Sequence, residues 1–140
     1  MYIKEIIAPD ALERASLIRL LNTLTTNCTF TDEKLNNLLQ ASESHLFGLY
    51  EDEELIGCCC LGIYYSLTGK KACLEDVVVL PEHQGKSGGR MLVAHAAEEA
   101  QKHHVGQLLF TSNPKRVKAN QLYQKMEFER KETNVYIKKW

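Results

Sequence analysis

The residues best suited to chemistry in this 140-residue chain surround a group of glycines, a segment here called the glycine loop: Gln84, Gly85, Lys86, Ser87, Gly88, Gly89 and Arg90. An apolar run, Leu74 to Leu80, leads into this loop and is closed by Pro81, and a stretch with helical spacing follows it. Where a strand, a tight loop and a helix start meet, several backbone N–H groups point at one spot, and missing Cβ atoms permit a close approach. The stretch therefore predicts an anion-binding loop.

The glycine spacing excludes two common phosphate-binding motifs. A P-loop requires G-x-x-x-x-G-K-[ST], and the first glycine of that pattern is missing before Lys86 and Ser87. The dinucleotide fingerprint G-x-G-x-x-G is absent as well. The alternative to an anion site is an ordinary turn in which Ser87 caps the following helix.

Two stretches of the chain resemble the GNAT superfamily of N-acetyltransferases. Gln84 to Gly89 is similar to the [RQ]-x-x-[GA]-x-[GA] loop with which that family holds the pyrophosphate of acetyl-CoA. Further on, the chain resembles the second half of the family pattern through Asn113, Ala119, Tyr123 and the pair Glu127-Phe128. The chain departs from the pattern at Ser87 (usually Gly or Ala), at Gly88 (usually branched and apolar, so packing should loosen) and at Glu127 (usually Gly).

The resemblance implies an α/β (α+β) GNAT fold in one domain, residues 1–140, with a mixed sheet of about six to seven strands and four helices in the order β-α-α-β-β-β-α-β-α-β. Helical spacing and caps predict helices at Ala11–Leu24 (N-cap Asp10), Asp32–Gln40 (N-cap Thr31), Gly88 to about His104, and Lys115–Met126. Strands are expected at Tyr2–Ile7, Ser44–Tyr50, Leu55–Tyr65, around Leu74–Val79, at Gln107–Ser112 and at Val135–Lys139. The acidic residues Glu51–Glu54 should form a solvated turn.

The resemblance also implies that an acetyl group passes from acetyl-CoA to a primary amine by direct attack within a ternary complex. Tyr123 would be the general acid, because a tyrosine hydroxyl is protonated at neutral pH and can supply a proton to the departing thiolate. Glu75, on the strand before the loop, would be the base, while Asp76 should point to the opposite face of that strand. The cofactor would contact Val77, Val78 and Val79, the glycine loop (Gln84, Gly85, Lys86, Ser87, Gly88, Gly89, Arg90), Asn113 and Asn120.

Composition narrows the classes of partner. The net charge of −1 lacks the basic excess of a nucleic-acid-binding protein, so we expect no nucleic-acid partner. No apolar run approaches the roughly 20 residues of a membrane span, and residues 1–5 lack a signal-peptide core, so we expect a cytoplasmic protein without a membrane partner. The five cysteines lack metal-ligand spacing, and we expect small buried side chains in a reducing compartment and no metal.

The acceptor amine is less defined. The strand Leu74–Val79 looks like that of glucosamine-phosphate acetyltransferases, whereas Thr111–Arg116 looks like a segment of aminoalkylphosphonate acetyltransferases, and amino acids and polyamines stay open. The acceptor pocket should involve Asn22–Phe30, Tyr64, Tyr65 and the C-terminal strand. Alternative functions are a protein or peptide N-acetyltransferase and a non-catalytic acyl-CoA sensor. The apolar Trp140 at the end of the chain leads us to expect a homodimer.

Overall fold

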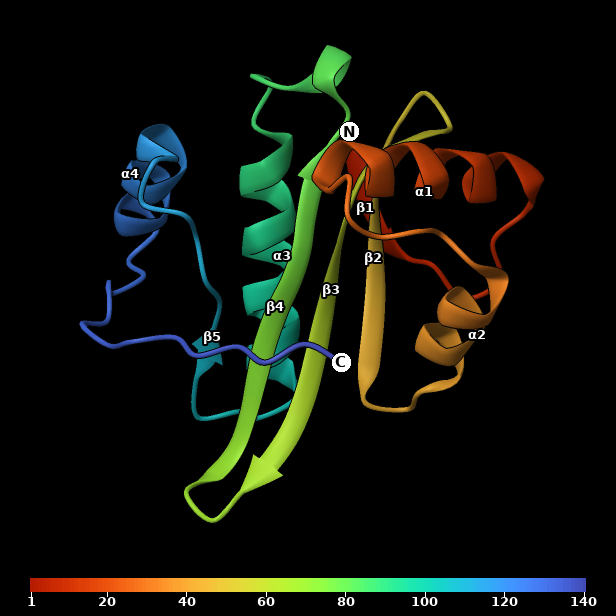
Figure 1. Ribbon diagram of the computed structural model, residues 1–140. Helices are drawn as coiled ribbons and strands as arrows, with labels where there is room; N and C mark the ends of the chain where they lie inside the picture. The colour runs from red at the N-terminus through yellow and green to blue at the C-terminus, as the bar shows by residue number, and fades with distance from the viewer. The chain divides into compact units, whose positions relative to one another are not determined.

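The computed structural model describes residues 1–140 as two compact units, Met1–Phe110 and Thr111–Trp140. The first unit contains a five-stranded sheet with the order β1-β2-β3-β4-β5, together with three α-helices, and the second unit contains one helix (Figure 1). The elements are β1 (Tyr2–Glu5), α1 (Ala11–Leu24), α2 (Asp32–Gln40), β2 (Ser44–Glu51), β3 (Glu54–Ser66), β4 (Gly69–Val79), a 3-10 turn (Pro81–His83), α3 (Gly88–Lys102), β5 (Leu108–Leu109) and α4 (Val117–Lys125).

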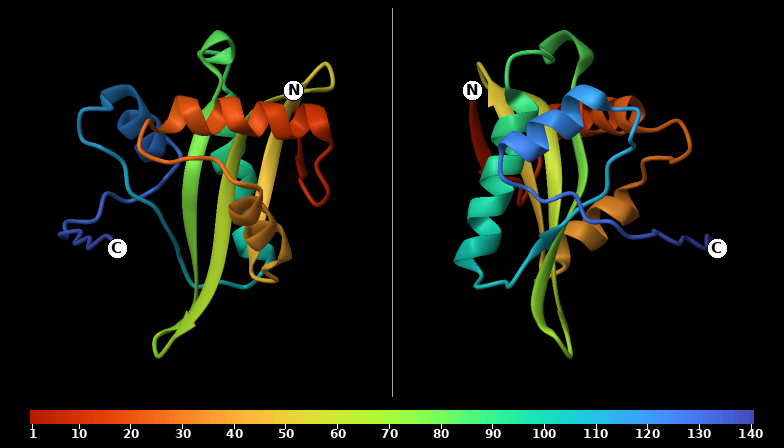
Figure 2. Two further views of the ribbon diagram at one scale, coloured as in Figure 1. Left: turned by 45° about the vertical axis from the view of Figure 1, so that its right-hand side comes forward. Right: turned by 90° about the vertical axis from the view of Figure 1, so that its left-hand side faces the viewer.

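The sheet separates two layers of helices in the first unit. Strands β1 to β4 are antiparallel and β5 lies parallel to β4. Helices α1 and α2 cover one face and α3 covers the other (Figure 2). The three consecutive cysteines of β3 follow this division: Cys58 and Cys60 face α1 and α2, whereas the thiol of Cys59 lies 3.9 Å from the Leu92 carbonyl oxygen of α3. The side chains of these cysteines thus alternate between the two faces of the sheet, as in a regular strand.

Capping residues set the starts of the first two helices as predicted. The Asp10 carboxylate accepts a hydrogen bond from the N–H of Glu13 (2.8 Å), and the Glu13 carboxylate accepts one from the N–H of Asp10, which completes a capping box. The hydroxyl of Thr31 accepts a hydrogen bond from the N–H of Lys34 at 3.1 Å. Glu13 also accepts a hydrogen bond from the hydroxyl of the buried Tyr50, which ties α1 to β2. Both helices have the predicted bounds.

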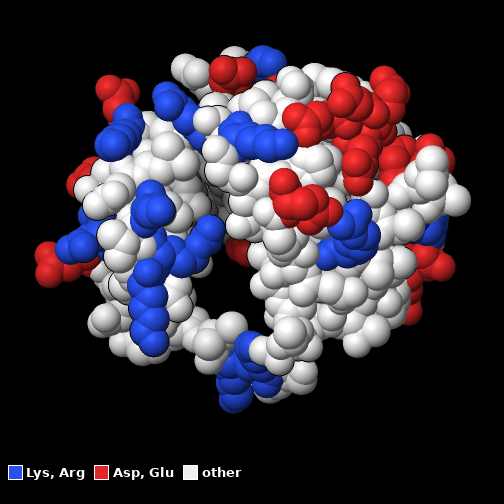
Figure 3. All heavy atoms as spheres, turned by 90° about the horizontal axis from the view of Figure 1, so that it is seen from above, with Lys and Arg blue, Asp and Glu red and all other residues white.

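The acidic turn is shorter than predicted. Because Glu51 and Glu54 are paired in the ladder between β2 and β3, only Asp52 and Glu53 remain in the turn. Both have positive φ, 46° and 69°, as the tight hairpin turn that matches strand twist requires. Acidic side chains gather at this end of the first unit (Figure 3).

The sheet has fewer strands than the six to seven predicted. The strand expected over Gln107–Ser112 is reduced to Leu108–Leu109, and the strand expected over Val135–Lys139 does not form. Val135 and Ile137 are 71% and 78% exposed, and residues 126–140 contain no strand with which this segment could pair within the second unit. The alternating apolar residues favour an extended backbone, but a strand forms only where a neighbouring strand completes its hydrogen bonds.

A bulge interrupts the pairing of β3 with β4. Cys58 is opposite Val78 and Cys60 is opposite Glu75, so β4 has one residue more than β3 over this interval. Asp76, within the bulge, has a φ of 55°, which is rare for a non-glycine residue. The bulge changes which side chains β4 presents to the α1 and α2 face.

Candidate functional site

The glycine loop is tied to the end of β4. The side-chain amide of Gln84 donates a hydrogen bond to the carbonyl oxygen of Val79 at 2.9 Å, so the loop folds back onto the strand. The imidazole Nδ1 of His83 lies 2.9 Å from a carboxylate oxygen of Glu51, at the end of β2. These contacts fix where α3 begins relative to the sheet.

Ser87, at the N-terminus of α3, does not cap the helix. It adopts the left-handed conformation, with a φ of 66°, and its side chain makes no capping hydrogen bond. A serine cap requires an extended backbone from which the hydroxyl can reach the next turn, so the alternative of an ordinary capped turn is wrong. The first N–H that bonds within the helix is that of Met91, to the carbonyl oxygen of Ser87 at 3.0 Å. The N–H groups of Gly88, Gly89 and Arg90 therefore remain available to a ligand.

The two glycines of this helix start have different surroundings. A Cβ on Gly88 would lie 2.8 Å from a methyl carbon of Leu49, so Gly88 lets α3 approach the sheet. The expected loosening of packing at Gly88 is wrong, because the missing side chain is what allows the close contact. A Cβ on Gly89 would have no heavy atom within 4 Å. Gly89 thus adjoins free space at the mouth of the glycine loop.

The edge of β4 that faces β5 is partly uncovered. The two strands pair only at Ala72 with Leu108 and at Cys73 with Leu109, although β4 continues to Val79. From Leu74 onward no strand lies beside this edge. An extended chain with amide groups can pair with such an edge, as a strand does.

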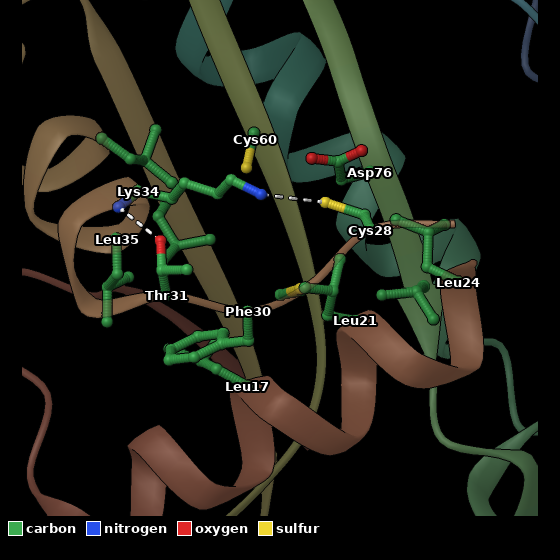
Figure 4. A pocket seen from close by; sticks show the side chains of 14 residues that line it. Leu17, Leu21, Leu24, Cys28, Phe30, Thr31, Lys34, Leu35, Cys60 and Asp76 are labelled. Atoms are coloured by element: carbon green, nitrogen blue, oxygen red, sulfur yellow. Dashed lines mark hydrogen bonds between the residues drawn. The ribbon is translucent and has the colours of Figure 1, made fainter. Parts of the chain in front are cut away.

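On the other face, a pocket of about 250 Å³ lies between α1, α2 and the sheet, and we call it the α1–α2 pocket (Figure 4). Its lining is mainly apolar, with one carboxylate and one ammonium group. The residues are Leu17, Leu21, Leu24, Cys28, Phe30, Thr31, Lys34, Leu35, Leu38, Leu46, Cys58, Cys60, Asp76 and Val78. The predicted acceptor segment Asn22–Phe30 contributes to this wall.

The carboxylate of this pocket belongs to Asp76 and not to Glu75. The expectation that Asp76 lies on the face of β4 opposite to Glu75 was wrong. The bulge breaks the strict alternation of β4, so Asp76 lines the same face as Cys60, the residue that pairs with Glu75. Loss of solvation raises the pKa of Asp76, and the nearby Glu75 carboxylate raises it further. Asp76 and Glu75 are both exposed residues overall, and Glu75 accepts a hydrogen bond from the thiol of Cys73 at 3.3 Å. Glu75 is not among the residues that line the pocket.

Lys34 and Cys28 form one rim of the α1–α2 pocket. Cys28 belongs to the predicted acceptor segment, whereas the sequence interpretation assigned no role to Lys34. The Lys34 ammonium donates a hydrogen bond to the carbonyl oxygen of Thr29 (2.9 Å) and lies 3.6 Å from the sulfur of Cys28. It is directed toward the side of the pocket that carries Asp76 (Figure 4). A signal for Lys34 was present in the sequence: it lies beside Leu35 and one helical turn before Leu38, at the edge of the apolar face of α2. Nothing comparable marked the bulge.

Several cysteine expectations need correction. Cys28 is exposed because it lies in the loop after α1, and Cys73 is only half-buried on β4. Burial raises the pKa of the thiols of Cys58, Cys59 and Cys60 far above the ordinary value. Burial and the Glu75 contact raise the pKa of Cys73 to about 11.

The predicted aromatic residues of the acceptor site lie elsewhere. Tyr64 and Tyr65, at the far end of β3, are 43% and 71% exposed and do not line the pocket. Their expected role in an acceptor pocket stays a prediction that the α1–α2 pocket does not support. The C-terminal segment expected beside them forms no strand.

Asn113, Asn120 and Tyr123 lie in the second unit. The Asn120 amide donates to the carbonyl oxygens of Asn113 (2.9 Å) and Arg116 (2.8 Å), and the Asn113 side chain accepts from the N–H of Lys115 (2.9 Å). Both asparagines thus order the start of α4. Tyr123 is a half-buried residue of α4.

Glu127 follows α4 with a φ of 68°, the left-handed conformation that the family pattern assigns to glycine. No His, Cys, Asp and Glu side chains form a group of three or more that could hold a metal ion. No helix is both long and apolar enough to cross a bilayer.

The chain resembles known proteins in both its sequence and its fold. The sequence model of the acetyltransferase (GNAT) family matches residues 15–128. Streptothricin acetyltransferase of Streptomyces lavendulae is 33% identical over 66 residues, which make up 47% of this chain and 35% of that protein. The chain thus matches only about a third of the length of this relative.

Three solved structures resemble nearly the whole chain. An aminoglycoside acetyltransferase from an uncultured soil metagenomic sample has a TM-score of 0.84 and 17% identity, with 99% of this chain and 95% of that chain covered. The aminoglycoside 6'-N-acetyltransferase of Acinetobacter haemolyticus has a TM-score of 0.79 and 20% identity, and the match covers 100% of this chain and 99% of that chain. Glucosamine-6-phosphate N-acetyltransferase of Arabidopsis thaliana has a TM-score of 0.80 and 19% identity, and the match covers 100% of this chain and 99% of that chain. At these identities the likeness shows the fold.

Proposed function

Because the chain belongs to the GNAT acetyltransferase family, we propose that it transfers the acetyl group of acetyl-CoA to a primary amine of a small molecule. The observation that carries this proposal is the start of α3, where the left-handed Ser87 leaves the helix uncapped and its first N–H groups available. The α1–α2 pocket, with a single carboxylate, supplies a place for an amine on the other face of the sheet.

The residues around the glycine loop fit acetyl-CoA. The N–H groups of Gly88, Gly89 and Arg90 suit a pyrophosphate, and the positive end of the α3 dipole adds to their effect. Gly89 offers free space for close approach. The amide groups of a pantetheine arm suit the uncovered edge of β4 at Val77 to Val79. Acetyl-CoA would supply an acetyl group activated as a thioester.

The acceptor must lose a proton before it attacks. We assign the base to Asp76 in place of Glu75, because only Asp76 lines the pocket. Its raised pKa makes it a stronger base than an ordinary aspartate, and an apolar wall favours the neutral form of a bound amine. The bound ammonium first passes one proton to Asp76. The neutral nitrogen then attacks the thioester carbonyl carbon, the carbon–sulfur bond breaks, and the second amine proton leaves to solvent. The departing thiolate takes up a proton, which by the family resemblance Tyr123 would supply.

A thiol-release assay with acetyl-CoA and a panel of small primary amines tests this function. Intersecting initial-velocity lines are expected, because direct attack requires both substrates to be bound together, whereas an acetylated enzyme intermediate would give parallel lines. A peptide-only acceptor range would favour a protein acetyltransferase. If the protein binds acetyl-CoA but releases no thiol with any of the amines or peptides tested, an acyl-CoA sensor would be favoured.

The assignment of the base has a matched pair of variants on neighbouring residues. Asp76→Asn should lower kcat by 10²- to 10⁴-fold, the usual loss when a positioned base is removed. Glu75→Gln should retain most activity, because Glu75 lies outside the pocket wall. A large loss of kcat in Glu75→Gln together with a small loss in Asp76→Asn would instead identify Glu75 as the base.

A further inference from the structure

We propose that the acceptor is a small monoamine with an apolar body, and that Lys34 excludes amines that carry a second positive charge. This inference rests on the proposed acetyltransferase function and deepens it. Its basis is the juxtaposition of an apolar wall, one carboxylate and one ammonium group in the α1–α2 pocket.

The wall selects for an apolar body. Leucine side chains from α1 and α2 supply most of it, with Phe30, Val78 and the thiols of Cys58 and Cys60. Hydroxyl groups of a sugar would find few partners there, since Thr31 is the only hydroxyl residue and its oxygen already accepts from the N–H of Lys34. Buried polar groups without partners weaken binding. The volume of about 250 Å³ lies below the range of about 300 to 1,000 Å³ that is usual for ligand pockets, so the acceptor must be small.

The charges select for one amine. Asp76 is the only carboxylate in the wall, so the pocket can neutralise a single ammonium group. The Lys34 ammonium has no carboxylate partner; its contacts are the Thr29 carbonyl and the Cys28 thiol. Its charge therefore acts on whatever enters the pocket. A second ammonium group on the acceptor would meet this charge at close range, and at the effective dielectric of a protein surface that repulsion lowers affinity at least about tenfold.

The same charges disfavour aminoglycosides, which carry several amino groups on hydroxylated rings. Two of the similar solved structures are named as aminoglycoside acetyltransferases, yet at this identity they share only the fold with this chain. The side chains of the α1–α2 pocket point to a different acceptor. A carboxylate on the far end of the acceptor, by contrast, would be attracted to Lys34.

Three amines of equal chain length test the proposal in the thiol-release assay. Hexylamine ends in a methyl group, hexamethylenediamine in a second amine, and aminocaproate in a carboxylate. For the wild type, kcat/KM for hexylamine should exceed that for hexamethylenediamine by at least about tenfold. Lys34→Met keeps the apolar stem and removes the charge, so it should bring the two values close together. Lys102→Met, a matched change at an exposed ion pair on α3, should leave the ratio unchanged.

Comparable kcat/KM for the monoamine and the diamine in the wild type would overturn the proposal. An unchanged ratio in Lys34→Met would overturn the role of Lys34. Thiol release with aminoglycosides but not with hexylamine would overturn the acceptor class and leave the acetyltransferase function standing.

Alkylation of Cys28 gives a readout that does not depend on turnover. Iodoacetamide should modify Cys28 first, because Cys28 is exposed whereas the pKa values of the other four thiols are raised. Hexylamine in the pocket should slow this alkylation, as followed by peptide mass mapping, and hexamethylenediamine should slow it less. Slowed alkylation supports the proposal even if no thiol is released, in which case the catalytic function alone has failed. Equal alkylation rates with and without hexylamine overturn the proposal.

Discussion

Replacing Gly89 by valine should abolish acetyl-CoA binding and leave the fold intact. A Cβ at this position meets no heavy atom within 4 Å, so the protein has room for the side chain. The added methyl groups would occupy the space beside the free N–H groups at the start of α3. The intrinsic change in helix propensity from glycine to valine is within about 0.5 kcal/mol.

The size of the effect follows from linkage. Acetyl-CoA at about 100 times its Kd should stabilise the wild type by about 2.7 kcal/mol. For a chain of this length that corresponds to a rise in Tm of about 8 to 10 °C. Gly89→Val should show no rise, while its Tm without ligand stays within about 2 °C of the wild type. Differential scanning fluorimetry with and without acetyl-CoA measures both quantities.

Two glycine variants serve as controls. Gly62→Val makes the same change on β3, where a Cβ would come no closer than 4.0 Å to another atom, so both the fold and the acetyl-CoA response should persist. Gly88→Val should instead lower the Tm without ligand, because its Cβ would lie 2.8 Å from Leu49. A full acetyl-CoA response in folded Gly89→Val would refute the assignment of the anion site to the start of α3.

Three further variants separate chemistry from stability. Tyr123→Phe should lower kcat by 10²- to 10⁴-fold with an unchanged acetyl-CoA thermal shift, and retention of more than about half the turnover would make Tyr123 a packing residue. Asp76→Asn should raise the Tm near neutral pH. The folded-state pKa of Asp76 lies above its unfolded value, so the folded protein is more stable with Asp76 protonated than with Asp76 ionised. The wild type loses this stability as the pH rises through the folded-state pKa, whereas asparagine stays neutral. The gain over the wild type should vanish at a pH below the unfolded value, and a Tm below the wild type near neutral pH would contradict the desolvation of Asp76. Glu127→Gly should raise the free energy of unfolding by about 1 kcal/mol, because glycine adopts a φ of 68° without the cost that a glutamate bears. If Glu127 is not strained, the variant should have a lower Tm than the wild type in thermal unfolding.

The parts of the fold that follow local rules were predictable from the sequence. Asp10 and Thr31 set the starts of α1 and α2, since a cap depends on residues within one helical turn. The glycine loop was identified for the same reason. The family was identified because two local patterns occur at a fixed separation in the chain, and the family match confirms it.

The parts that depend on distant residues were not predictable in this way. The bulge at Asp76 arises from how β4 pairs with β3, and counting alternate residues along β4 alone assumes that no such bulge exists. The segment Val135–Lys139 has strand-like alternation but no strand to pair with in its unit. The role of Ser87 was also hidden, because a serine before a helix predicts a cap, whereas its left-handed backbone directs the hydroxyl elsewhere.

The most direct test of the central claim follows the acetyl group itself. The protein is incubated with hexylamine and with acetyl-CoA that carries an isotopic label in the acetyl group. The products are separated, then identified and quantified by mass spectrometry. The account predicts labelled N-acetylhexylamine and free CoA in equal amounts, and loss of the labelled amide in Asp76→Asn. Label that stays on CoA, or that appears only as acetate, with hexylamine and with every other amine of the panel would contradict acetyl transfer to an amine.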